Sequence, residues 1–242
     1  MAYRQDPDLD FLGKCTSEEL ADLVYLLTFD KDNKARLTEQ LSSNGKYKRY
    51  YPDHKMYWEE IAEEIQRFGG NTVSNLIRLG KGVLYREILC DVCDKVKAKY
   101  DKKSNTTKIE QDLMLHLLET SLEKMSTEEI KAVQEKLGVD SQVELTSKAT
   151  VAAISALLVA NPGSSVLLYI AIGELLVAPF LSTAIGSTAA FLASRAIAAA
   201  VPITLAISTI WAIKDISGTA YRVTVPAVIE VALLRAKQAN KS

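Results

Sequence analysis

The residues best suited to chemistry are the cysteines of the motif "CDVC". Cys90 and Cys93 are three residues apart, a spacing found in zinc sites and in thioredoxin-type redox motifs. A structural zinc site needs four ligands, but the sequence has no second cysteine pair, and His54 and His116 each stand alone. A redox motif should open a helix after a strand, whereas these cysteines lie in the middle of a helical pattern. We interpret both as structural, and we expect neither a metal nor a cofactor.

Two other segments could bind a ligand. Residues 44–58, "NGKYKRYYPDHKMYW", alternate basic with aromatic side chains, which can stack on bases or sit at a lipid interface. We favour the simpler interpretation of a tyrosine-rich loop packed on a helix. The glycine pair in "FGGNTVSN" lacks the spacing of a phosphate-binding loop and follows a helix, so it predicts a helix end. No Ser–His–Asp or Cys–His set is apparent, and we expect a protein without catalytic residues that is not an enzyme.

The elements that position these residues are helices. Apolar residues recur at helical spacing in several stretches before residue 148, and no stretch there alternates convincingly between apolar and polar residues. Capping boxes, in which a Ser or Thr and a Glu three residues later satisfy each other's backbone amides, predict three helix starts. The boxes are Thr16 with Glu19, Thr107 with Glu110, and Ser126 with Glu129. The sequence therefore predicts an all-α protein that begins with an amphipathic helical bundle.

Charge and apolar composition together divide the chain into three parts. Residues 1–148 contain 23 Lys/Arg and 27 Asp/Glu, a net charge of −4, and residues 149–242 contain 6 and 3, a net charge of +3. We therefore predict a charged amphipathic helical domain at 1–148, an apolar membrane-type helical hairpin at 149–213, and a basic C-terminal helical segment at 214–242. In the last segment, Tyr221 to Val225 could be extended, and Pro226 could occupy the first turn of a helix over Ala227–Ala239.

The apolar tract is the strongest functional signal. Glu174 and Arg195 are the only charged residues between residues 149 and 213, and a helix needs about 20 apolar residues to span a bilayer core. Because a charge at a bilayer centre is costly, we predict that Glu174 and Arg195 form an intramembrane pair or face water. An ion pair in a soluble core, or two charges that simply reach the surface, remains the alternative. Small residues four apart predict a ridge for close helix packing; they are Ser182, Gly186, Ala190, Ser194 and Ala198.

Three states could accommodate the tract. It could sit permanently in a membrane, it could be wrapped by the amphipathic helices and released to lipid as in pore-forming colicins, or it could be the core of an ordinary soluble protein. Basic residues flank the tract, which would place both ends of a hairpin in the cytoplasm. No secretory signal is visible, and three cysteines fit a reducing compartment. We therefore expect a cytoplasmic protein that is associated with or inserted in the inner membrane.

Four motifs resemble the uncharacterised bacterial YaaW-like family. They are "DPDLDFLGKCTSEELADLVYLLT", "FGGNTVSN", "LYREILCDVCDKVK" and "SGTAYRVTVPAVIEVALLR", and their order and spacing match over most of the chain. The family is grouped with ubiquinol–cytochrome c chaperone-like proteins. The resemblance therefore implies an all-α module that assists membrane-protein assembly, and it brings no catalytic residues.

These observations give two functional hypotheses. In the first, the protein is non-enzymatic and its hairpin inserts into or packs on the inner membrane, with a pore-forming or permeabilising role as a toxin or defence effector. Its partners are then the lipid bilayer and further copies of itself, joined through the small-residue ridge. In the second, it is a soluble assembly chaperone whose partner is a client membrane protein. Neither hypothesis involves nucleic acid.

Overall fold

The computed structural model describes residues 3–30, 34–37, 39–70, 83–160, 162–181 and 221–241. Within these ranges the protein is all-α, as predicted, and its one β-type contact is a bridge between Phe29 and Ala35. Two short 3-10 helices, η1 (Asp10–Lys14) and η2 (His54–Tyr57), accompany the α-helices. The α-helices are α1 (Ser17–Thr28), α2 (Gly45–Tyr50), α3 (Trp58–Gly70), α4 (Tyr85–Val96), α5 (Thr106–Leu122), α6 (Thr127–Lys136), α7 (Ser147–Ala160), α8 (Pro162–Leu181) and α11 (Tyr221–Ala239).

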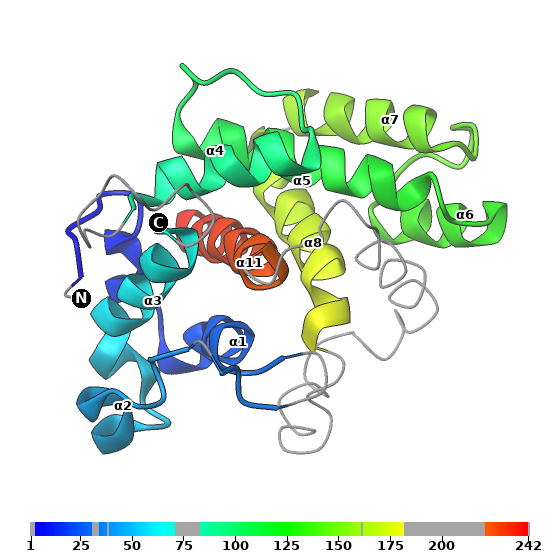
Figure 1. Cartoon of the computed structure of the whole chain (residues 1–242). Coiled ribbons are helices and arrows are strands. Elements are labelled where there is room, and N and C mark those ends of the chain that lie inside the picture. Colours follow the sequence, from blue (N-terminus) through cyan, green and yellow to red (C-terminus); the bar gives the residue numbers. More distant parts are fainter. Residues whose placement is uncertain are drawn as a thin grey trace.

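Helix α11 forms the centre of the described structure. It contacts α8, α1, α4, α3 and α5, and it lies between them in Figure 1. Every residue from Val223 through Leu234 is buried, including the polar Thr224 and Glu230, as expected of a central helix that is mostly apolar on all sides. The helix begins at Tyr221 and contains Pro226 in its interior, so the predicted start at Ala227 was wrong. Pro226 has no backbone N–H, so one helical hydrogen bond is missing. The burial of apolar side chains on every side of the helix offsets this loss.

Two of the three predicted capping boxes are confirmed. Both begin helices, α1 at Thr16 with Glu19 and α6 at Ser126 with Glu129. The third is wrong, because the N-cap of α5 lies two residues earlier, at Asn105, whose side chain accepts a hydrogen bond of 2.8 Å from the Lys108 amide. The side chain of Glu110 turns inward and is 1% exposed, so it is a core residue and not a cap.

The apolar tract enters the structure as α7 and α8. Helix α8 packs against α11, α7, α5 and α1, and Ile172, Leu175 and Leu176 on it are at most 1% exposed. Most apolar side chains in the second half of α8 are thus covered by helices of the same chain, whereas Leu167 near its start is 56% exposed. The proposed division of the chain at residues 148 and 213 stays a prediction.

The membrane hypothesis is corrected by this arrangement. Within the residues that the structure describes, no helix has both the length and the apolar character needed to cross a bilayer. The prediction of an inserting or pore-forming protein was therefore wrong. Three predicted features lie outside the described residues. They are the second helix of the hairpin, the small-residue ridge at 182–198, and Arg195. Glu174, the other member of the expected pair, forms an ion pair of 3.1 Å with Lys237 on α11.

Candidate functional site

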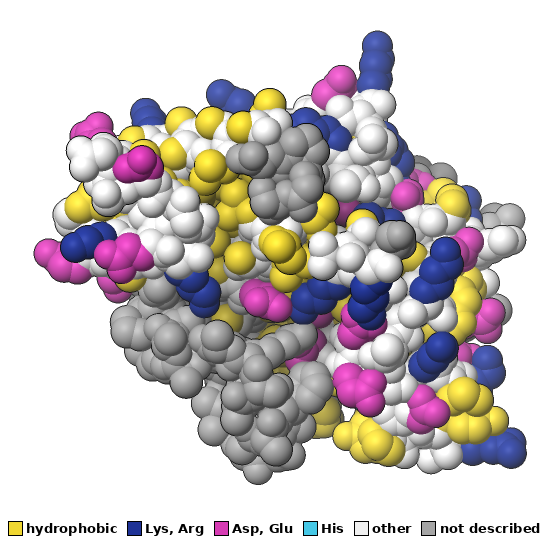
Figure 2. Space-filling view, turned by 180° about the vertical axis from the view of Figure 1, so that it is seen from behind, with side chains coloured by type: hydrophobic (Ala, Val, Ile, Leu, Met, Phe, Trp, Pro, Cys, Tyr) yellow, Lys and Arg dark blue, Asp and Glu magenta, His cyan; other side chains and the backbone are white. Residues whose placement is uncertain are grey.

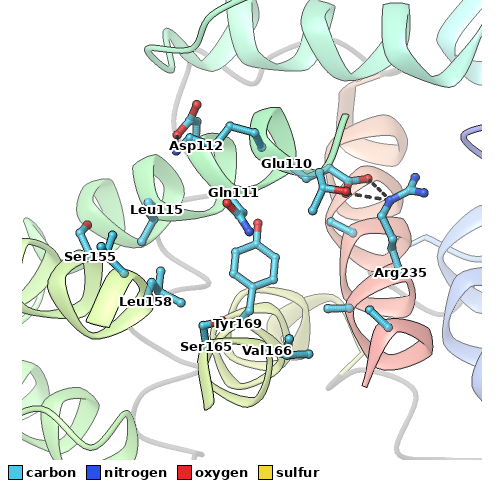
Figure 3. A pocket seen from close by; sticks show the side chains of 16 residues that line it. Glu110, Gln111, Asp112, Leu115, Ser155, Leu158, Ser165, Val166, Tyr169 and Arg235 are labelled. Carbon is cyan, nitrogen blue, oxygen red and sulfur yellow. Dashed lines mark hydrogen bonds and ion pairs between the residues drawn. The ribbon is translucent and has the colours of Figure 1, made fainter. Parts of the chain in front are cut away.

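A pocket of about 420 Å³ opens between α5, α7, α8 and α11. Figure 3 shows the side chains that line it. Its α11 wall is made mainly of small side chains, Ala232, Ala236 and Ala239, which recur at helical spacing and leave space that larger residues would fill. The volume lies within the range of small-molecule sites. The α5 wall consists of Thr107, Lys108, Glu110, Gln111, Asp112 and Leu115, α7 contributes Ser155, Leu158 and Val159, and α8 contributes Ser165, Val166 and Tyr169.

Tyr169 is the most unusual residue of the pocket wall. Its side chain is 4% exposed, and its hydroxyl has no hydrogen-bond partner among the described residues. Figure 3 shows the ring projecting from α8 toward α5, on the side where Gln111 lies. Burial raises the pKa of Tyr169 well above its ordinary value, so the phenol keeps its proton and can donate a hydrogen bond. A buried hydroxyl without a partner is uncommon in proteins, and each case calls for an explanation.

A buried ion pair borders the pocket. Arg235 on α11 donates from Nε to both carboxylate oxygens of Glu110, at 2.9 and 3.2 Å. The Tyr85 hydroxyl donates to the same carboxylate at 2.7 Å. Burial raises the pKa of Glu110, against the opposing effects of the Arg235 charge and of these hydrogen bonds. The bifurcated hydrogen bond from Arg235 and the hydrogen bond from Tyr85 therefore satisfy both carboxylate oxygens within the protein.

Arg235 also connects the pocket to the N-terminal segment. Its Nη2 donates to the Asp8 carbonyl at 2.7 Å, and its guanidinium lies 4.5 Å from the centre of the Phe11 ring, within cation–π range. Asp6 accepts a hydrogen bond from the backbone amide of Tyr85 at 2.6 Å. One wall of the pocket is thus held by contacts with residues more than 200 positions away in the sequence.

The rim of the pocket is polar and reaches the surface. Lys108 and Asp112, one helical turn apart on α5, form an ion pair of 2.7 Å. Val159, on the opposite wall, is 82% exposed, so a molecule could enter from solvent at this side. Figure 2, a view from the opposite side to Figure 1, shows hydrophobic side chains gathered in its upper part, with charged side chains beside and below them.

The predicted chemical motifs lie elsewhere. Cys90 and Cys93 are in the middle of α4, as expected, and neither forms a disulfide. Burial raises the pKa of Cys93 to about 12, which makes its thiol a weak nucleophile. In the part of the chain that the structure describes, no group of three or more His, Cys, Asp and Glu residues could hold a metal ion.

Sequence reasoning missed the pocket. Glu110 was assigned to a helix cap, and Tyr169 lies within the apolar tract, where no sequence pattern singled it out. One signal was available: Arg235 ends a run of residues that is otherwise almost wholly apolar, and an arginine in such a setting usually has a buried partner. The residues predicted as sites do not meet here, because Glu174 lies outside the pocket lining and the others lie outside the described residues.

Comparisons with known proteins place the chain among relatives of similar length. Residues 3–37 match a family model described as a domain of unknown function, DUF3944. The chain is 40% identical over 244 residues to a UPF0174 protein of Helicobacter pylori strain J99, and this match covers 100% of the chain and 96% of that protein. It is 36% identical over 237 residues to the UPF0174 protein YaaW of Escherichia coli strain K12, and this match covers 96% of the chain and 95% of that protein. No solved structure matches. These similarities confirm the YaaW-like resemblance but give no support to the chaperone grouping, so the chaperone alternative is not retained.

Proposed function

The chain belongs to the UPF0174 family, and we propose that it is a non-enzymatic helical protein that binds a small amphipathic molecule in the pocket between α5, α7, α8 and α11. The observation that carries this proposal is the Tyr169 hydroxyl, which is buried beside the pocket and has no partner among the described residues. The cytoplasmic location and the absence of a nucleic-acid partner stay predictions.

The energetics of Tyr169 favour a bound molecule. Leaving a buried hydroxyl without a hydrogen bond costs about 1–3 kcal/mol, and a ligand with a hydrogen-bonding group would remove that cost. Leu115, Leu158 and Val166 offer the ligand an aliphatic surface on three different helices. Pockets that combine a mostly apolar wall with a few placed polar groups are typical of small-molecule sites.

The lining supports binding without catalysis. The 16 lining residues include no histidine and no cysteine. The carboxylate of Glu110 is occupied by Arg235 and Tyr85, so it has little capacity left to act as a base. A site that catalysed proton transfer would need such a group within reach of the ligand.

Filling the pocket tests the proposal. The full chain should bind the neutral fluorescent probe N-phenyl-1-naphthylamine, measured by fluorescence titration. We expect Ala236→Leu, which adds a large side chain to the α11 wall, to weaken this binding at least about tenfold because the added volume occupies the pocket. Ala156→Leu is the matched control, because Ala156 is exposed on α7 and is not part of the lining. Mass spectrometry of any molecule that copurifies should recover it chemically unchanged.

Two results would overturn this function. The first is a folded wild-type protein that binds no apolar probe. The second is equal probe affinity in wild type and in Ala236→Leu, with circular dichroism showing that both are folded. In either case the pocket would be a packing defect of the helices and not a binding site.

A further inference from the structure

The charged residues of the pocket are already paired with one another. Arg235 pairs with Glu110, and Lys108 pairs with Asp112. Each pair joins one positive and one negative side chain, so the four charged lining residues sum to zero. Glu110 is 1% exposed and Asp112 is partly covered. A ligand with a charged head would therefore find no unpaired counter-charge among the residues that line the pocket.

The hydrogen-bonding groups that remain are neutral. The Tyr169 hydroxyl has no partner among the described residues, and no hydrogen bond links the Gln111 side chain to another described residue. A phenol can donate one hydrogen bond and can also accept one, and a carboxamide offers two N–H donors and one oxygen acceptor. Both side chains line the pocket, Gln111 from α5 and Tyr169 from α8. Neutral groups of this kind suit a neutral partner, because burying an unpaired charge costs far more than burying a hydroxyl.

We infer that the ligand is an uncharged aliphatic molecule whose hydroxyl or carbonyl head is held by Tyr169 and Gln111, with its chain against the apolar wall. This inference rests on the proposed binding function and narrows its ligand class. The Tyr169 hydroxyl donates to the head oxygen, and the Gln111 amide donates to the same oxygen or accepts from a hydroxyl. Leu115, Leu158 and Val166 cover the chain.

A head-group series tests the inference at fixed chain length. Octan-1-ol, octanoate and octylamine would each be titrated at pH 7 against N-phenyl-1-naphthylamine bound to the full chain. At this pH octanoate is an anion and octylamine is a cation. We expect octan-1-ol to displace the probe at a concentration at least about tenfold lower than either charged compound, because only the alcohol avoids an unpaired buried charge.

Two variants test whether Tyr169 and Gln111 bind the head group of the ligand. Tyr169→Phe and Gln111→Met keep most of the side-chain volume but remove the hydrogen-bonding atoms. Each should weaken octan-1-ol binding about fivefold, the loss expected for one hydrogen bond, once the probe's own affinity has been measured separately for each variant. Tyr221→Phe is the control, because Tyr221 lies outside the pocket lining.

The outcomes separate this inference from the function on which it rests. If the probe binds but octanoate or octylamine competes as well as octan-1-ol, the inference fails and the binding function stands. The inference also fails if Tyr169→Phe and Gln111→Met leave octan-1-ol affinity unchanged. If the probe binds to none of the folded proteins, the proposed function itself fails.

Discussion

Two buried tyrosines have opposite hydrogen-bonding environments. The hydroxyl of Tyr85 donates to Glu110 at 2.7 Å, whereas that of Tyr169 has no partner among the described residues. Without ligand, we expect Tyr85→Phe to lower the free energy of unfolding by about 1–3 kcal/mol, because it removes a hydrogen bond to a buried charge. Tyr169→Phe should leave it unchanged or raise it by up to about 1 kcal/mol, because it removes an unsatisfied group. Urea denaturation of the two variants beside wild type measures both effects.

Each tyrosine variant is the control for the other, since both remove one oxygen from a buried aromatic ring. Equal destabilisation by the two substitutions would mean that the Tyr169 hydroxyl already has a partner in the folded protein and is not available to a ligand.

The Glu110–Arg235 pair should show strong coupling. Removing one partner leaves the other charge buried without compensation, and this typically costs about 3–5 kcal/mol. We expect Glu110→Leu and Arg235→Met each to destabilise the protein by roughly that amount. The double variant should lose clearly less than the sum, because it leaves no unpaired charge. Free energies of unfolding that simply add in the double variant would show that the two side chains do not interact in solution.

At the scale of elements, α8 and α11 approach each other closely at Gly173. Gly173 on α8 faces α11, and a Cβ added there would lie 3.2 Å from Leu233 Cβ and 3.0 Å from Met114 Cε. The methionine end can move, but Leu233 Cβ is fixed to the central helix. We therefore expect Gly173→Ala to lower the free energy of unfolding by about 1–3 kcal/mol through overpacking, more than the helix propensity of alanine restores.

Gly45 provides the matched control for this substitution. It lies at the start of α2, and an added Cβ there would have no heavy atom within 4 Å. Gly45→Ala should be neutral or stabilise the protein by up to about 1 kcal/mol, the propensity effect alone. Thermal and urea denaturation would measure both variants. Equal effects at the two positions would mean that α8 can move away from α11 without cost.

Local signals in the sequence predicted the elements well. The capping boxes of α1 and α6 depend on residues three positions apart, and the stop after α6 coincides with Gly138, whose φ is +69°. Ile61, Ile65 and Phe68, which recur at helical spacing in the sequence, are all buried on α3, and Trp58 at the start of this stripe is half-buried. Such features follow from propensities and periodicity within one helix.

The site could not be predicted in the same way, because its residues meet only after the helices pack. Glu110 and Arg235 are 125 residues apart. The spacing of Thr107 and Glu110 fitted a capping box, but a buried salt bridge took the carboxylate and Asn105 capped the helix instead. The length of the apolar tract suggested lipid, whereas α8 is covered by α11, α5 and α1. Helix order alone does not specify which helix covers which.

At the scale of the whole molecule, the two ends of the chain stabilise each other through α11. The segment that matches DUF3944, residues 3–37, includes η1 and α1, and both contact α11. Arg235 reaches Asp8 and Phe11 from within the pocket wall. A ligand that orders this wall should therefore also stabilise the N-terminal segment, which gives the pocket a physical connection to the part of the chain that the family model covers.

The acid sensitivity of the fold should report on this contact between the ends. Glu19 caps α1 and accepts hydrogen bonds from Gln238 at 3.0 Å and from Lys241 at 2.8 Å. Partial burial raises the pKa of Glu19, but the hydrogen bond and charge of Lys241 and the bonds from Thr16 and Gln238 outweigh it and lower the pKa overall. The unfolded chain then binds a proton more readily than the folded protein, so stability is lost as the pH falls below about 4.5 through the folded-state pKa.

The variant Glu19→Gln isolates this contribution. It should be less stable than wild type at pH 7, and the difference should shrink as the pH falls from about 5 to about 3, because protonated Glu19 no longer differs in charge from glutamine. Urea denaturation at several pH values measures this difference. Glu18→Gln, an exposed position in the same first turn of α1, controls for the helix dipole. Because Glu18 does not join the two ends, its substitution should change the pH profile far less. Parallel profiles for wild type and Glu19→Gln would mean that the contact between α1 and the end of α11 does not stabilise the folded protein.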